Sequence, residues 1–101
     1  MVKVFQRTTV FDRWLRRVRD PIGVARILIG IRALESGGAP DVTHLGSGLF
    51  ELRIHAGPGY RVYFCRLAAG EWVLLSGGDK ASQRRDIRAA RRLRDRLEGV
   101  R

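Results

Sequence analysis

The sequence predicts a small α+β domain in which a mostly antiparallel sheet packs against a helical hairpin and a C-terminal helix. Residues 48–76 alternate apolar and polar side chains and are interrupted by glycine-containing turns, as strands are. Residues 9–37 and 82–98 instead repeat their apolar side chains at helical spacing. With 101 residues and the element order β-α-α-β-β-β-α, we expect one domain that spans residues 1–101.

The N-terminal part of the chain predicts a strand and a first helix. Apolar and polar residues alternate from Val2 to Arg7, which predicts the strand. Thr9 is the expected N-cap of the helix, with Asp12 three residues later. The side chains of its apolar stripe are Phe11, Trp14, Leu15 and Val18.

A second helix follows after a short link. Asp20-Pro21 predicts its N-cap and first turn, and Gly37-Gly38 predicts its end. The side chains expected to face the core are Ile22, Ala25, Ile29 and Leu34. Because the link is so short, we expect the two helices to form an antiparallel hairpin. A polar loop over residues 39–46 should lead into the sheet.

The next two strands predict a sheet with one apolar and one polar face. In the first of them the expected core side chains are Phe50, Leu52 and Ile54, and the opposite side carries Glu51, Arg53 and His55. In the second, Tyr60, Val62 and Phe64 alternate with Arg61, Tyr63 and Cys65. We therefore expect arginines and a tyrosine on a solvent-exposed face.

The turn between these strands determines whether Arg53 and Arg61 lie side by side. A five-residue loop from His55 to Gly59 pairs Arg53 with Arg61, and a three-residue loop also keeps both on one face. A four-residue loop conflicts with the apolar pattern. Two adjacent arginines repel each other, so this arrangement favours an anionic ligand. The alternative is that they are solvated surface charges that pair with Glu51.

The C-terminal part predicts a last strand, a loop and a basic helix. The strand spans Trp72 to Ser76, with Val73 and Leu75 facing the core, and the loop from Ser76 to Asp79 leads to Lys80. Such a loop can bring backbone N–H groups and an ammonium group to a phosphate, although it lacks the spacing of a nucleotide-binding P-loop. Ser82 should open the helix, whose apolar stripe is Ile87, Ala90, Leu93 and Leu97. Seven arginines lie between residues 84 and 96, against three acids, Asp86, Asp95 and Glu98.

The composition narrows the classes of partner. A formal net charge of +10 favours nucleic acid, an acidic protein or an anionic membrane surface. No apolar run approaches the roughly 18 residues that a membrane span needs, and no signal peptide is evident, so we expect a cytoplasmic protein. The single cysteine, Cys65, cannot form an internal disulfide. His44 and His55 lack cysteine partners at zinc spacing, so we expect no metal and no cofactor.

Three segments carry a family resemblance. The stretches GLFELRI, GPGYRVYF and LLSGGDKASQRRDI resemble the RelE/ParE toxin superfamily and, within it, the phage-derived HigB-type addiction-module killer proteins. The resemblance extends from the helix at Phe11 to Ile87. It implies a RelE-like fold and a type II toxin that cleaves mRNA in the ribosomal A site. It also implies a cognate antitoxin as partner, which we expect to be a small helix-turn-helix protein encoded next to this one.

The resemblance also implies site residues for a metal-independent endoribonuclease. Arg53, Arg61 and Lys80 match the family's basic positions. Glu51 stands where a basic residue is common, and the last helix has no tyrosine or histidine, which leaves Gln83 as its nearest polar candidate.

The proposed chemistry needs cations, a base and an acid. Cations would stabilise the charge that develops when the 2′-OH attacks the adjacent phosphate. Glu51 is the candidate base, or it orients the arginines; Tyr63 or His55 is the candidate acid. Tyr63 could instead stack on an RNA base, and His55 could be an exposed hairpin residue. The residues expected to contact mRNA or ribosomal RNA are Arg84, Arg85, Arg88, Gln83 and His55.

Two other functions remain open at this point. The same fold serves ParE-like inhibitors of DNA gyrase, and a non-catalytic module that binds nucleic acid or an antitoxin would also suit the charge. For a toxin of the ribosome-dependent class we expect an acidic or amphipathic antitoxin segment that covers Arg53, Arg61 and Lys80, or that wraps the toxin elsewhere and blocks its entry into the ribosome, while the toxin keeps its fold. The alternative is that the antitoxin displaces the last helix from the sheet.

Overall fold

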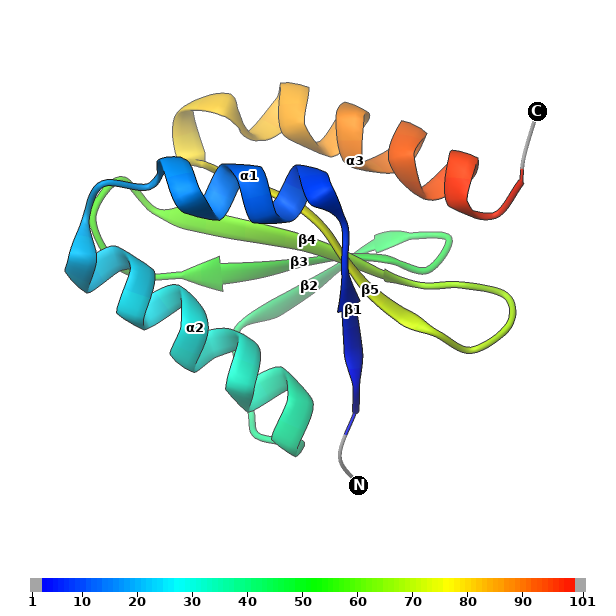
Figure 1. The fold of residues 1–101 in the computed structure, drawn as a ribbon, viewed down its shortest axis with the longest axis horizontal. Helices are drawn as coiled ribbons and strands as arrows, with labels where there is room; N and C mark the ends of the chain where they lie inside the picture. Colours follow the sequence, from blue (N-terminus) through cyan, green and yellow to red (C-terminus); the bar gives the residue numbers. More distant parts are fainter. Residues whose placement is uncertain (1–2, 100–101) are drawn as a thin grey trace.

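Five strands form one twisted sheet, with α2 and α3 on opposite sides of it (Figure 1). This computed structural model describes residues 3–99. The strand order is β1-β5-β4-β3-β2, in which β1 runs parallel to β5 and every other pair is antiparallel. The strands are β1 (Phe5–Arg7), β2 (Val42–Gly46), β3 (Leu49–Ile54), β4 (Tyr60–Arg66) and β5 (Trp72–Asp79). The helices are α1 (Thr9–Arg17), α2 (Pro21–Ser36), the 3₁₀ turn η1 (Lys80–Ser82) and α3 (Gln83–Leu97).

The α+β fold class predicted from the sequence is confirmed, with one additional strand. The expected loop over residues 39–46 is wrong in its second half, because Val42–Gly46 forms β2 and pairs with β3. The turn that joins the two strands has positive φ angles at Gly46, Ser47 and Gly48. Its glycines accommodate this left-handed backbone without strain, which lets so short a connection reverse the chain.

The last strand is longer than expected. Ser76 to Asp79 is not a loop but the second half of β5, where it pairs with residues 60–63 of β4. Gly77 permits this, because a Cβ at that position would overlap the indole ring of Trp14. Gly77 therefore serves the close packing of α1 on the sheet rather than a turn.

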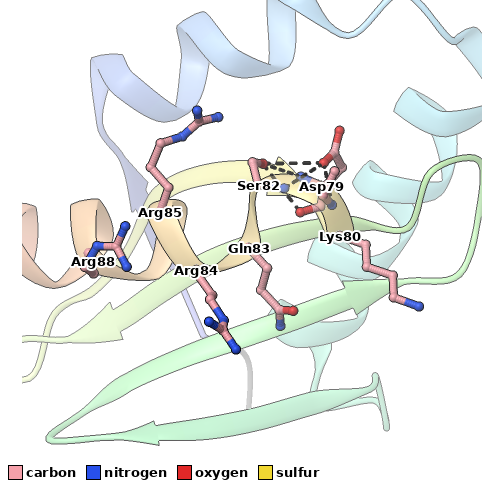
Figure 2. Close-up of a pocket in the computed structure, with 8 residues that line it drawn as sticks. Asp79, Lys80, Ser82, Gln83, Arg84, Arg85 and Arg88 are labelled. Atoms are coloured by element: carbon pink, nitrogen blue, oxygen red, sulfur yellow. Dashed lines mark hydrogen bonds between the residues drawn. The ribbon is translucent and has the colours of Figure 1, made fainter.

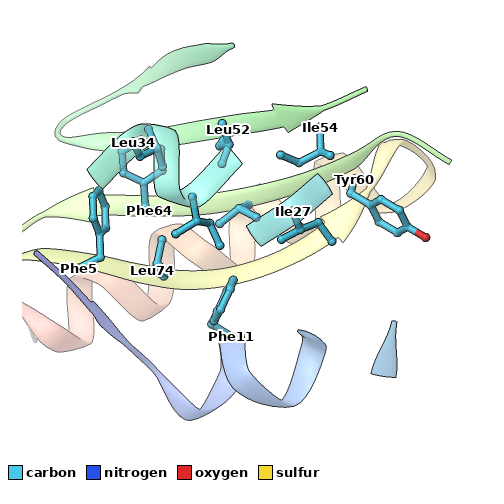
Figure 3. Packing of buried hydrophobic residues seen from close by; sticks show 11 residues of the cluster. Phe5, Phe11, Ile27, Leu34, Leu52, Ile54, Tyr60, Phe64 and Leu74 are labelled. Atoms are coloured by element: carbon cyan, nitrogen blue, oxygen red, sulfur yellow. The ribbon is translucent and has the colours of Figure 1, made fainter. Parts of the chain in front are cut away.

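One buried cluster lies between the sheet and the first two helices (Figure 3). Phe11 of α1 and Ile27 of α2 meet side chains from the core face of the sheet. The alternation predicted for β3 and β4 is confirmed on this face, where the buried strand residues are Leu52, Ile54, Tyr60, Val62 and Phe64. Trp14, Leu15 and Val18 pack against the cluster, as the apolar stripe of α1 predicted.

A second buried cluster lies under α3, which the sequence did not predict. It joins Tyr63 and Cys65 of β4 to Ala90 of α3, and the expected exposed position of Tyr63 is therefore wrong. Val73 and Leu75 belong to this cluster, whereas Leu74 belongs to the first one. Ile87 and Leu93 pack here as expected, but Leu97 is exposed and lies outside the stripe.

α1 and α2 run in roughly opposite directions, and their axes diverge from the link that joins them (Figure 1). The N-cap of α1 is Thr8 rather than Thr9, since its Oγ1 accepts a hydrogen bond from the Phe11 N–H at 3.0 Å. Asp20 is the N-cap of α2 with Pro21 in the first turn, and Gly37 ends the helix in the left-handed conformation, as predicted.

The core-facing side of α2 differs from the predicted one. Its buried residues are Gly23, Ile27, Ile31 and Leu34, whereas Ile22, Ala25 and Ile29 face solvent. The helix carries apolar side chains on both sides, so its sequence pattern alone did not select the buried one.

Two further findings concern the first strand and the length of the helices. The first strand begins at Phe5, and Val2 of the predicted strand lies outside the described residues. Among residues 3–99, no helix is long and apolar enough to cross a membrane.

Candidate functional site

The β3–β4 hairpin places two arginines opposite each other. Its register pairs Ile54 with Tyr60, Arg53 with Arg61 and Leu52 with Val62, as the five-residue loop predicted. Gly57 and Gly59 in this loop have positive φ angles of 51° and 80°. Both arginine side chains project from the face that α3 partly covers.

Glu51 lies between the two guanidinium groups. Its Oε1 is 3.5 Å from Arg53 Nε and its Oε2 is 3.6 Å from Arg61 Nε. The carboxylate is buried, and Gln83 Nε2 donates a hydrogen bond to Oε2 at 2.8 Å. Glu51 therefore holds the two arginines together and ties them to the first turn of α3. This geometry favours the orienting role over that of a base, because the carboxylate has no access to a bound substrate.

The two arginines differ in exposure. The Arg53 side chain is 40% exposed and donates from Nη2 to Thr43 Oγ1 at 2.7 Å. The Arg61 side chain is only 11% exposed and donates from Nη1 to the Gly59 carbonyl at 2.8 Å. In addition to the ion pairs with Glu51, these hydrogen bonds hold both guanidinium groups in place. Recognition of a phosphate by a preorganised site requires such fixed donors. The expectation that both arginines are solvent-exposed is therefore wrong for Arg61.

Lys80 joins this hairpin to the start of α3. It is exposed and follows β5 directly, in a turn fixed by Asp79, whose Oδ1 accepts from the N–H groups of Ala81 and Ser82 at 2.9 and 3.2 Å. Two surface hollows share Lys80. One of about 450 Å³ is lined by residues 53–59, Arg61 and Lys80, and the other of about 670 Å³ is lined by residues 79–85 and Arg88.

The arginines at the start of α3 project in different directions (Figure 2). Gln83 and Arg84 point to one side of the helix, whereas Arg85 points to the opposite side. Arg88 lies further along the helix and also lines the larger hollow. The structure thus places Gln83 and Arg84 on one side of the helix and the Arg85 guanidinium on the other, although all three line the larger hollow with Lys80.

The acids of α3 and of its C-cap do not neutralise these cations. Asp86 accepts from Ser82 Oγ, and the Glu98 carboxylate accepts from the Ala68 N–H. Only Asp95 pairs with an arginine, its neighbour Arg94, at 2.7 Å. Among residues 3–99, no ion pair involves any of the cations that line the larger hollow: Lys80, Arg84, Arg85 and Arg88. The hollow is therefore strongly electropositive.

The two proton-donor candidates have opposite environments. Tyr63 is fully buried, and burial together with the nearby Glu51 carboxylate raises the pKa of its phenol far above the usual range. It has no surface on which a base could stack. His55 is exposed and lines the smaller hollow, where its Nε2 lies 2.6 Å from Asp41 Oδ2. The exposed hairpin position considered for His55 is thus observed.

Two residues of this region were missed from the sequence. Thr43 holds Arg53 and Asp41 holds His55, and both come from the segment that was expected to be a loop. Only the recognition of β2 as a strand paired with β3 would have placed them here. His44 stacks on Phe50 at a centroid distance of 4.7 Å and belongs to the packing. Within the described part of the chain, no cluster of three or more His, Cys, Asp or Glu side chains could hold a metal ion.

Known sequences share most of this chain. The family described as "Phage derived protein Gp49-like (DUF891)" matches residues 13–98, which include every residue of the two hollows. An uncharacterized protein of Haemophilus influenzae is 39% identical over 90 residues, which cover 89% of this chain and 91% of that protein.

Proposed function

Because the chain belongs to the Gp49-like family of phage-derived proteins, a RelE/HigB-like toxin family, we propose that it is a HigB-type toxin that cleaves mRNA on the ribosome. In this proposal it acts in the cytoplasm, without a metal or cofactor, and is silenced by a cognate antitoxin. The single observation that carries the enzymatic part is the Arg53–Glu51–Arg61 cluster beside Lys80.

The cluster suits the binding of a phosphodiester. Glu51 compensates the repulsion between the arginines, and their outer N–H groups and the Lys80 ammonium remain as donors near one hollow. A strand that continues into the neighbouring hollow meets Arg84 and Arg88. Two adjacent cationic hollows that share a lysine match the spaced charges of a nucleic-acid backbone better than they match a single small anion.

The reaction would be an internal transfer at phosphorus. The ribose 2′-OH attacks the adjacent phosphorus, the bond to the 5′-oxygen breaks, and a 2′,3′-cyclic phosphate and a 5′-hydroxyl form. Negative charge grows on the phosphoryl oxygens in the transition state, where Arg53, Arg61 and Lys80 would stabilise it. Removal of one such donor typically lowers the rate by about 10²–10³-fold.

In this proposal His55 donates the proton that the departing 5′-oxygen takes up, and a water molecule accepts the proton of the attacking 2′-OH. His55 is the histidine that lines the hollow beside the arginines, and histidine exchanges protons near neutral pH. Asp41 fixes the orientation of its ring. Glu51 acts as the orienting residue, and Tyr63 as part of the packing under α3.

The ribosome supplies what this small site lacks. The two hollows are lined mainly by cations and backbone, with no Phe, Tyr or Trp side chain on which a base could stack. We therefore expect clear cleavage of translated mRNA and weak or no cleavage of naked RNA.

The test is in-vitro translation followed by primer extension. The wild-type protein should produce discrete cuts in the translated message, and Arg53→Ala and Lys80→Ala should each reduce cutting by about 100-fold. Arg13→Ala, a change of an exposed arginine on α1, is the matched control and should cut like the wild type. Full activity in both cluster variants would refute the assignment. Inhibition of DNA supercoiling by gyrase without any RNA cleavage would identify the ParE-like alternative instead.

A further inference from the structure

The side of α2 that faces away from the sheet is apolar and uncovered. Ile22 is 70% exposed and Ile29 is 63% exposed. Figure 1 shows no other described element on the side of α2 that faces away from the sheet. Four apolar residues of α2 are spaced three or four positions apart and therefore form one stripe over three turns: Ile22, Ala25, Ile29 and Ala33. We call this stripe the outer face of α2.

The outer face has the chemistry of a helix–helix contact. Branched isoleucines that alternate with alanines let a second helix approach closely, as in coiled-coil seams. A shallow hollow of about 440 Å³ adjoins it, lined by Leu28, Ile29, Arg32, Ala33 and Ser36. A helix that is apolar on both sides is normally covered on both, and here the sheet covers only one.

Charge selects the occupant. Arg26 and Arg32 are exposed and flank the stripe on its two sides. The remaining charged residue of α2, Glu35, is half-buried. A second copy of this chain would bring these arginines together and add two net charges of +10, which opposes self-association. A helix with acidic side chains on both flanks of an apolar stripe would instead pair with both arginines.

We propose that the outer face of α2 is a docking site for an amphipathic partner helix with acidic flanks. In a toxin–antitoxin pair the antitoxin would supply that helix, and in this respect the inference rests on the proposed function. The outer face lies on the opposite side of the sheet from the Arg53–Glu51–Arg61 cluster, because α2 packs on the first buried cluster and α3 on the second. A partner held there need not cover the cations directly.

The probe is a fluorescein-labelled helical peptide of about 21 residues, with leucines on one stripe and glutamates on both flanks. A matched peptide carries lysines in place of the glutamates. Fluorescence anisotropy should show saturable binding of the glutamate peptide to the wild-type protein and much weaker binding of the lysine peptide. The double variant Ile22→Ser/Ile29→Ser should weaken binding by about tenfold or more. Val10→Ser, at an exposed valine of α1, is the matched control and should not.

Charge reversal separates docking from general attraction to a basic protein. Arg26→Glu/Arg32→Glu should lose the glutamate peptide and gain the lysine peptide, although most of the net positive charge remains. Binding that is indifferent to the isoleucine or arginine changes would overturn the proposal, as would a wild-type dimer in sedimentation that Ile29→Ser dissociates. None of these measurements uses RNA cleavage, so failure of the proposed enzymatic function would leave their outcome unaffected.

Discussion

Glu51 is the residue on which the arrangement of the cationic site depends. A buried carboxylate is stabilised only if cations or donors compensate it, and here two arginines and Gln83 do so. The same contacts position the guanidinium groups, so the Glu51 side chain is needed both for the stability of the fold and for the geometry of the proposed site. The two arginines share this role unequally, because Arg61 is far more buried than Arg53.

The unequal burial predicts different stabilities for the two alanine variants. Arg61→Ala should lower the free energy of unfolding by roughly 1–3 kcal/mol, because it leaves Glu51 buried with one cation fewer. Arg53→Ala should stay within about 1 kcal/mol, since solvent screens its half-exposed pair with Glu51. Urea denaturation followed by circular dichroism measures both. Equal losses in the two variants would show that burial does not set the strength of these pairs.

The two tyrosines make stability depend on alkaline pH. Burial raises the pKa of Tyr63, with Glu51 adding to the effect, and burial raises the pKa of Tyr60, with its hydrogen bond to Asp20 adding. The folded protein thus keeps phenol protons that the unfolded chain releases. Stability is fully present below the unfolded pKa near 10 and falls as pH rises above it. Tyr63→Phe should flatten this fall in urea titrations from about pH 9 to 11, and an unchanged slope would contradict it.

At the scale of elements, one residue joins the start of α1 to the sheet. Thr8 Oγ1 accepts from the Phe11 N–H and donates to the Leu75 carbonyl of β5 at 2.6 Å. A single hydroxyl therefore caps the helix and holds it on the central strands.

This predicts a contrast between neighbouring threonines. Thr8→Ala should lower the free energy of unfolding by about 1–2 kcal/mol, the usual effect of losing an N-cap. Thr9→Ala changes an exposed helical residue and should be close to neutral. Thermal denaturation of the two variants measures the difference. A larger loss of stability in Thr9→Ala than in Thr8→Ala would identify Thr9 as the N-cap, as expected from the sequence.

The elements also show how far sequence patterns reach. The register of the β3–β4 hairpin was predictable because only odd loop lengths keep both apolar stripes on one face. β2 was not, since its alternation is short and lies between glycine-rich segments. The Gly77-Gly78 pair suggested a loop, whereas its small size serves contacts with Trp14 and Asp86. These contacts depend on where α1 and α3 pack, which local patterns do not encode.

The candidate site also has one part that local sequence patterns predict and another that depends on tertiary packing. The opposition of Arg53 and Arg61 follows from register, and register is a local property. The burial of Glu51 and Tyr63 follows from α3 covering the sheet, which requires tertiary packing. The wrong choice of face on α2 has a third cause, because a helix with two apolar sides offers two solutions and only the assembled sheet selects one.

At the scale of the whole molecule, charge is concentrated at the helices rather than spread evenly. Arg13, Arg16, Arg17 and Arg19 are exposed on α1 and just after it. On α3, Arg91 and Arg94 instead donate to the carbonyls of Leu45 and Ser47 and so anchor the helix. A strongly basic protein binds RNA partly without regard to geometry, so the cations of the proposed site must be distinguished from the rest.

Salt dependence makes this distinction. Arg88→Gln should reduce the slope of log K against log salt by about 0.7 for a single-stranded RNA of about 12 nucleotides, as expected when one cation no longer neutralises a phosphate. Arg13→Gln removes the same charge from α1 and should leave the slope unchanged. Fluorescence anisotropy at several salt concentrations measures both slopes. Equal reductions would assign RNA binding to net charge alone.

During synthesis, β1 emerges from the ribosome long before its parallel neighbour β5 has been made. The sheet cannot close until that late strand leaves the exit tunnel, since β1 has no other partner among the described strands. Arg53 and Arg61 emerge earlier than Lys80, which follows β5, and earlier than Gln83, which holds Glu51. A nascent chain that ends before α3 therefore lacks the Lys80 ammonium and the hydrogen bond from Gln83 to Glu51. We therefore expect a protein proposed to attack translating ribosomes to remain inactive until its C-terminal part has emerged from the ribosome that produces it.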